Sequence, residues 1–208
     1  MREGLAFVWA NKRLRLTFVV MAVVSTFGFN YIVALPLLAD RRFGSEAAFG
    51  WMLAITGLGS FCGSLFLAAK NRSSMRIYLV SIAGFATSAI GLAWAPNLSV
   101  AYLLCITMGF GGAIFIASAN ILTQNDTPDH MRSRMLALTA VAFLGSTPIG
   151  GPITGWVADH VSAEWSLAYG GMISLACAVA VALALVLRSQ WVHGSGRALE
   201  VSGQVPRG

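Results

Sequence analysis

Asn30 and Tyr31 stand side by side within a long apolar stretch, and Asn120 and Thr147 lie within two other such stretches. Their amide and hydroxyl groups can exchange hydrogen bonds with a passing molecule, and nearby aromatic rings can give it apolar contact. The alternative is that these groups only join packed helices to one another. The candidates for a substrate path are Phe27, Asn30, Tyr31, Phe115, Asn120 and Thr147.

Groups that could perform covalent, metal or proton chemistry are missing from the apolar stretches. Every Asp, Glu, Lys, Arg and His lies outside them, and no Gly-rich phosphate-binding loop with Lys is present. Cys62, Cys105 and Cys177 form no C-x-x-C pair, so we interpret them as packing residues. The sequence therefore predicts no enzyme activity, no cofactor, no metal site and no intramembrane proton carrier of its own.

The longest apolar stretch, residues 77–125, determines the class of protein. Its 49 residues contain no Asp, Glu, Lys, Arg or His. As one helix it would measure roughly 74 Å at about 1.5 Å per residue, more than twice the roughly 30 Å hydrocarbon core of a bilayer. It must therefore cross twice, and Pro96 marks the turn.

The rest of the chain repeats this pattern, in keeping with 57% hydrophobic residues, 11% charged residues and a mean hydropathy of +0.73. We predict an all-α integral membrane protein with a bundle over 16–187. Residues 1–15 have the pattern of an interfacial helix on the membrane, or alternatively of an extension of the first crossing. Residues 188–208 have the composition of a disordered tail. The six predicted crossings are 16–39, 47–69, 77–95, 99–123, 135–158 and 165–187.

The basic residues predict which side of the membrane each loop occupies. Six crossings place both termini on one side, together with twelve Lys and Arg residues, whereas only Arg41 and Arg42 lie on the other. The excess of positive charge predicts that both termini are cytoplasmic in a multi-pass protein of the cell membrane. This topology explains the net charge of +6 better than nucleic-acid binding does.

Proline and glycine crowd the fifth crossing, where they predict two interruptions and a bend. A bend of this kind either flexes during transport or is a static kink. The candidates for bending or gating are Pro148, Gly150, Gly151, Pro152 and Gly155.

A short internal repeat relates the second and fifth crossings. Residues 52–56 read MLAIT and residues 135–139 read MLALT, an offset of 83. These crossings run in opposite directions, so the repeat indicates a 3+3 inverted arrangement, although chance similarity is the alternative in so apolar a chain.

Several strings resemble the carboxy-terminal half of a major facilitator superfamily transporter, in the branch of macrolide and siderophore exporters. They are REGL at 2–5, FGFNY at 27–31, LPLL at 35–38 and PDHMRSR at 128–134, together with the Gly-rich fifth crossing. The loop at 70–76 departs from the family because its signature Asp is missing, and Gly151-Pro152-x-x-Gly155 is only similar to the antiporter motif of the other half. The cytoplasmic loop residues that enter this resemblance are Lys70, Arg72, Arg76, Asp129, Arg132 and Arg134.

The resemblance implies that the six helices are half of a twelve-helix fold. It implies efflux of a small amphipathic molecule by alternating access, as a proton antiporter whose coupling residues lie in an absent amino-terminal half. The expected partners are the lipid bilayer, the substrate and a second six-helix half, as a separate chain or a second copy. The alternatives are a truncated, non-transporting membrane fragment or assembly subunit and, disfavoured by the lack of charged rings, a channel.

Overall fold

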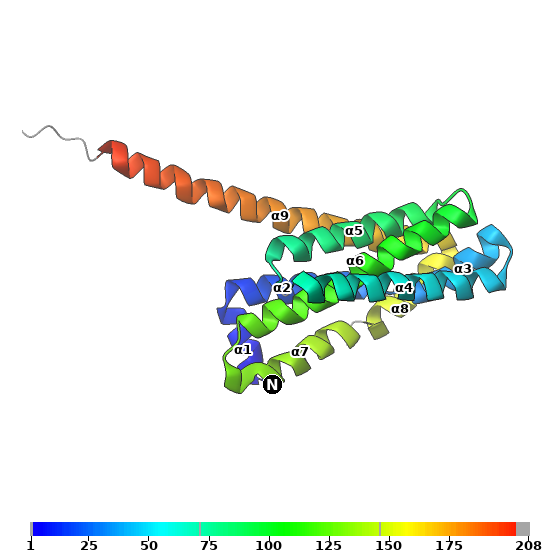
Figure 1. The fold of residues 1–208 in the computed structure, drawn as a ribbon, viewed down its shortest axis with the longest axis horizontal. Helices are drawn as coiled ribbons and strands as arrows, with labels where there is room; N and C mark the ends of the chain where they lie inside the picture. The colour runs from blue at the N-terminus through cyan, green and yellow to red at the C-terminus, as the bar shows by residue number, and fades with distance from the viewer. Residues whose placement is uncertain (1, 71, 146, 203–208) are drawn as a thin grey trace, which may run out of the picture.

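The computed structural model describes residues 2–70, 72–145 and 147–202, and over these residues it is a bundle of helices (Figure 1). In chain order they are α1 (Arg2–Ala10), α2 (Lys12–Phe27), α3 (Tyr31–Phe43), α4 (Glu46–Lys70), α5 (Met75–Ala93), α6 (Leu98–Asn125), the 3-10 turn η1 (Asp129–Met131), α7 (Arg132–Leu144), α8 (Thr147–His160) and α9 (Ala163–Ser202).

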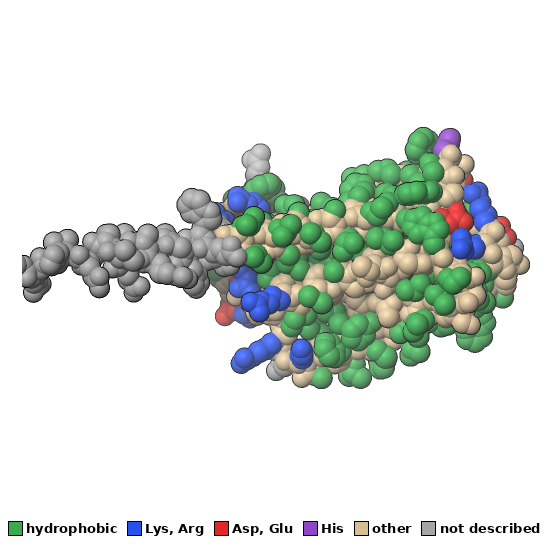
Figure 2. Space-filling model, turned by 90° about the horizontal axis from the view of Figure 1, so that it is seen from above, with side chains coloured by type: hydrophobic (Ala, Val, Ile, Leu, Met, Phe, Trp, Pro, Cys, Tyr) green, Lys and Arg blue, Asp and Glu red, His purple; other side chains and the backbone are tan. Residues whose placement is uncertain are grey.

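Six segments within the described residues are long and apolar enough to cross a membrane, which confirms the predicted fold class. Figure 2 shows apolar side chains over the middle of the visible face, with Lys and Arg gathered toward its two ends. The six segments are Lys12–Phe43, Ala47–Lys70, Met75–Ala93, Leu98–Asn125, Asp129–His160 and Ala163–Leu187.

The predicted hairpin turn lies between α5 and α6. Trp94 is the C-terminal cap of α5, and the side chain of Asn97 accepts a hydrogen bond from Val100 N at 3.0 Å, capping the start of α6. Pro96 falls between the two helices, where its missing N–H removes no helical hydrogen bond.

The first crossing is not the single helix that we expected over 16–39, because it is interrupted between α2 and α3. At the interruption, Asn30 Nδ2 donates to Thr26 O at 2.6 Å, the carbonyl that residue 30 N–H would reach in a continuous helix. A Cβ on Gly28 would lie 2.6 Å from Ser174 Oγ, so α9 packs closely at this point. The interruption contains no proline, which is why the sequence pattern missed it.

The fifth crossing has one interruption, between α7 and α8, and the second predicted one is wrong. Pro148 stands in the first turn of α8, where backbone N–H groups have no helical acceptor and proline costs little. Pro152 is accommodated inside α8, which continues to His160.

Helix packing follows the inverted repeat. Helix α4, the second crossing, packs on α6, the fourth crossing. In the same way α7 and α8 of the fifth crossing pack on α2 and α3 of the first. Likewise, α5 of the third crossing packs on α6 of the fourth, and α9 of the sixth crossing packs on α2 and α3 of the first. The third and sixth crossings, α5 and α9, pack on each other. These contacts between crossings correspond to one another as a 3+3 inversion requires.

The seam between α4 and α6 is closed at backbone distance. Gly109 of α6 faces Thr56 of α4 so closely that a Cβ would lie 2.9 Å from the Thr56 carbonyl carbon. Ser60 Oγ donates to Gly109 O at 3.2 Å across the same seam. Small residues permit such close approach in membranes, where packing and interhelical hydrogen bonds drive association.

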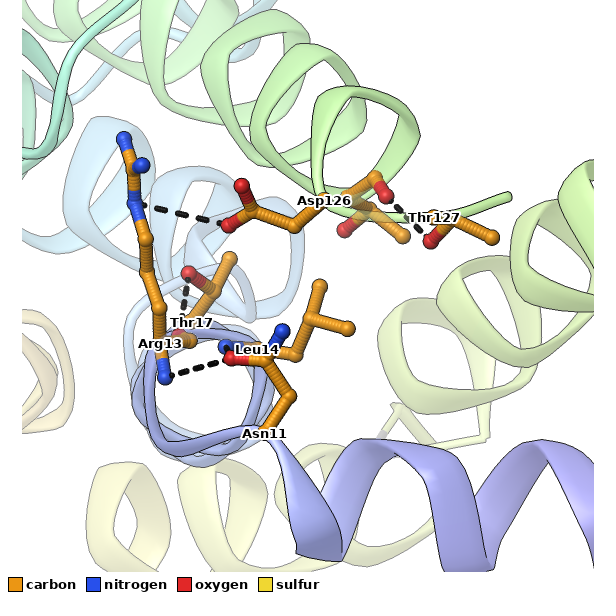
Figure 3. A network of polar contacts seen from close by, with 7 residues as sticks. Asn11, Arg13, Leu14, Thr17, Asp126 and Thr127 are labelled. Carbon is orange, nitrogen blue, oxygen red and sulfur yellow. Dashed lines mark hydrogen bonds and ion pairs between the residues drawn. The ribbon is translucent and has the colours of Figure 1, made fainter. Parts of the chain in front are cut away.

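Polar contacts close the bundle at the end that holds the start of α2 and the end of α6. Arg13 Nε lies 3.4 Å from Asp126 Oδ2, an ion pair without hydrogen-bond geometry. Figure 3 shows this pair beside Asn11, whose side chain accepts from Arg13 N at 3.0 Å and caps α2. Thr127 Oγ1, just past the end of α6, donates to Thr123 O at 2.5 Å.

Two arginines close the opposite end of the bundle. Arg41 Nη1 donates to Ala158 O of α8 at 3.0 Å. Arg42 Nε donates to Ala95 O in the hairpin turn at 2.9 Å, and its Nη1 lies 3.8 Å from Glu164 Oε1 at the start of α9. These contacts connect the three loops at this end.

The two terminal regions differ from a simple extension of the bundle. α1 is a separate helix that packs Val8 against Leu14 and Met135, and α2 already begins at Lys12, earlier than the expected boundary after residue 15. α9 continues past Leu187 to Ser202 and projects from the bundle (Figure 1). The expected disordered tail is therefore helical over 188–202, a stretch without proline, and its end at 203–208 lies outside the described residues.

Candidate functional site

A pocket of about 320 Å³ lies where the interruption of the first crossing meets α4, α5 and α6. Phe29 and Tyr31 reach it from the interruption, and Asn120 reaches it from α6. Its lining is Phe29, Tyr31, Ser60, Ser64, Phe85, Met108, Gly109, Gly112, Ala113, Ile116, Ala117 and Asn120.

Phe29 is the centre of the aromatic part of this pocket. Its ring stacks on Phe85 with centroids 4.8 Å apart and meets Phe143 of α7 edge to face at 5.1 Å. Phe115 lies 5.6 Å away behind it, and Tyr31 lies 6.1 Å away. The interruption therefore turns one aromatic side chain toward rings from four other helical segments.

The polar groups of the pocket are neutral. Tyr31, Ser64 and Asn120 bring a phenol, a hydroxyl and an amide, whereas Ser60 is already engaged with the carbonyls of Thr56 and Gly109. The lining residues include no Asp, Glu, Lys, Arg or His. Such a surface can stack aromatic or apolar groups and exchange a few hydrogen bonds, which suits a small molecule with both characters.

The structure brings Tyr31 and Asn120 together but separates the other path candidates. Phe27 does not line the pocket, and its ring meets that of Tyr169 edge to face with centroids 6.4 Å apart. Phe115 is fully buried behind Phe29, and the side chain of Thr147 lies outside the described residues.

Asn30 is 3% exposed and does not line the pocket. The side-chain amide of Asn30 donates a hydrogen bond to Thr26 O, and Gly150 of α8 packs directly against both groups. Asn30 thus forms its hydrogen bond within the first crossing and packs against Gly150 of the fifth, and its place on a substrate path stays a prediction.

The bending candidates lie along α8 and only some face the first crossing. Gly150 is buried against Thr26 and Asn30. A Cβ added to Gly151 would lie 3.8 Å from Asn30 Oδ1. Pro148 and Pro152 are exposed, and Gly155 has nothing within 4 Å. Gating at these residues stays a prediction.

The loop residues that were predicted to be cytoplasmic do not converge on the pocket. Lys70 and Arg76 line a separate groove, and Arg72 lines a third hollow. Asp129 Oδ1 and Arg132 Nη1 pair with each other at 3.0 Å, and Arg134 lies beside α1.

Sequence reasoning missed the central role of Phe29 together with Phe85, Ser60 and Ser64. Phe29 lies in the FGFNY string between Phe27 and Asn30, which are both candidates for the substrate path. The available signal was its position between Gly28 and Asn30, two residues that weaken a helix, because a side chain at a helix interruption can turn inward.

Comparison with known proteins agrees with this architecture. A family model described as Major Facilitator Superfamily matches residues 17–200. The chain is 26% identical to the multidrug efflux pump Tap of Mycolicibacterium fortuitum over 162 residues, which is 76% of this chain and 39% of that protein. It is also 26% identical over 136 residues to the multidrug resistance protein B homolog of Mycobacterium tuberculosis, covering 64% of this chain and 24% of that protein.

The chain thus spans well under half the length of these relatives. The family match covers nearly the whole helical bundle, including both interrupted crossings. The chain therefore belongs to the major facilitator superfamily.

Proposed function

We propose that this chain is half of a secondary transporter that exports a small amphipathic molecule by alternating access. The observation that carries the proposal is the neutral, aromatic pocket at the interruption of the first crossing, which combines stacking rings with the Tyr31 and Asn120 polar groups. Membrane transporters commonly bind substrate near the midplane, where helices of inverted repeats are interrupted. The names of the two relatives, an efflux pump and a resistance protein, favour export.

We infer that a second six-helix half, as a separate chain or as a second copy, completes the transporter. The short coverage of the relatives supports this inference. Proton coupling would then depend on ionisable residues of that other half, because the lining residues of this half carry none.

The orientation that we propose has both termini in the cytoplasm of a cell membrane. Lys70, Arg72 and Arg76 would share that side with the termini, and Arg41 and Arg42 would lie outside. Reporter tags inserted after Arg42 and after Arg72 should be accessible from opposite compartments. Equal accessibility of the two tags would overturn this orientation.

The transport proposal is tested by reconstitution in proteoliposomes with an imposed proton gradient and a fluorescent amphipathic dye. The chain is measured alone and together with the amino-terminal half of a relative. We expect export from the pair only. Export by the chain alone would identify the second half as another copy, and no export from either sample would favour the non-transporting fragment or assembly subunit.

A further inference from the structure

A groove of about 640 Å³ runs along α5, on a different face of α6 from the substrate pocket. Lys70 and Arg76 stand at one end of it, where α4 ends and α5 begins. Val80, Gly84 and Ile114 line its middle. The pocket and the groove share no lining residue.

The length of the groove matches one leaflet of a membrane. Its lining on α5 extends from Arg76 to Ser88, twelve residues further along the helix, which is roughly 18 Å at 1.5 Å per residue. Half of a bilayer hydrocarbon core is about 15 Å thick. The groove thus runs from the headgroup level, where its cations lie, to about the middle of the membrane.

At the charged end of the groove, no carboxylate of the described residues pairs with the cations. Lys70 Nζ lies 5.2 Å from the centroid of the Phe66 ring, and neither Lys70 nor Arg76 forms an ion pair with a described carboxylate. The sequence contains no Asp or Glu between Glu46 and Asp126. Two cations at the rim of an apolar groove are therefore suited to an external anion.

At the deep end of the groove, the hydroxyl groups already have hydrogen-bond partners within the protein. Ser88 Oγ and Thr107 Oγ1 hydrogen-bond to each other at 2.8 Å, and Thr87 Oγ1 donates to Ala83 O at 2.8 Å. Because these hydroxyls are satisfied, they can border a hydrocarbon chain without an unpaired polar group. Val80, 71% exposed, presents further apolar surface to it.

We propose that this groove binds one anionic phospholipid from the leaflet on the side of Lys70 and Arg76. The phosphate lies between the two cations, and one acyl chain follows α5 toward Ser88. Basic recesses between membrane helices recognise anionic headgroups in this way. Gly84 leaves room for the chain, because a Cβ at this position would meet nothing within 4 Å.

The test is native mass spectrometry of the 208-residue chain, delipidated in detergent and titrated with dioleoyl phosphatidylglycerol or, in parallel, dioleoyl phosphatidylcholine. Lys70→Ala and Arg76→Ala should each weaken binding of the anionic lipid about fivefold and leave the zwitterionic lipid unchanged. Arg72→Ala is the matched control, because Arg72 belongs to the same loop but lines a different hollow. It should bind like the wild type.

A second pair of variants tests the acyl chain. Gly84→Leu fills the groove and should reduce binding of both lipids, whereas Gly50→Leu, placed at an equally open glycine of α4, should not. Helix content and unfolding temperature of each variant are measured on the same samples. Equal loss in Arg72→Ala and Arg76→Ala, or wild-type binding by Gly84→Leu, would overturn the proposal.

Discussion

The two hollows beside α6 differ in chemistry although they share that helix. The pocket is aromatic and neutral, because the interruption at Gly28–Asn30 turns Phe29 toward Phe85. The groove is apolar with two cations at its rim, because it begins at the basic loop before α5. The difference shows that the segments packed beside α6 supply the stacking rings of the pocket and the cations of the groove, so one helix borders two sites of different chemistry.

The largest effect should come from the α4–α6 seam. Gly109→Leu would force a side chain against the Thr56 backbone and destabilise the chain by about 3 kcal/mol, the upper part of the range for overpacked sites. Thermal unfolding in detergent, followed by circular dichroism, measures this effect. Gly50→Leu is the control, and equal melting of the two variants would show that the seam is not closed.

The two asparagines of the first and fourth crossings should respond differently. Asn30→Leu leaves Thr26 O without its partner and crowds Gly150, so it should lower the free energy of unfolding by about 1–3 kcal/mol. Asn120→Leu changes the pocket and should reduce export while the unfolding temperature stays within experimental error. If Asn30→Leu unfolds like the wild type and loses export, whereas Asn120→Leu keeps export, the substrate path runs past Asn30 instead.

Phe29→Ala should weaken export of an aromatic dye by the reconstituted pair about tenfold, since it removes the ring that connects the aromatic cluster. The measurement is initial export rate against dye concentration. Phe61→Ala is the control, because Phe61 is 67% exposed on α4 and lines neither hollow. Similar initial export rates for Phe29→Ala and Phe61→Ala would show that the dye does not bind at the aromatic pocket.

The smallest effect is expected at Arg13. Unlike the cations of the groove, Arg13 already has a carboxylate partner in Asp126, and its side chain is 52% exposed. Arg13→Gln should therefore change stability by no more than about 1 kcal/mol and leave phosphatidylglycerol binding unaltered. A loss of lipid binding equal to that of Arg76→Ala would remove the distinction between paired and unpaired cations.

The sequence was sufficient for the fold class because charged residues stop at the ends of every crossing, and hydropathy depends only on composition. It could not locate the interruption in the first crossing, since Gly28, Phe29 and Asn30 include no proline and the apolar run continues past them. For the same reason the sequence pattern does not indicate that Phe29 lines a pocket. Asn30 and Asn120 are alike as residue types, and only packing distinguishes the one buried against Gly150 from the one that lines the pocket.

The most direct test of the account compares one cysteine in each hollow in a Cys62→Ser background, because Cys62 is the exposed native thiol. Ala113→Cys lies in the pocket and Val80→Cys in the groove. In proteoliposomes that hold the assembled pair, a membrane-impermeant maleimide should label residue 113, more slowly when substrate is added, and should not label residue 80. Labelling of residue 80 at an equal rate, or no labelling of residue 113 in a pair that exports dye, would contradict the account.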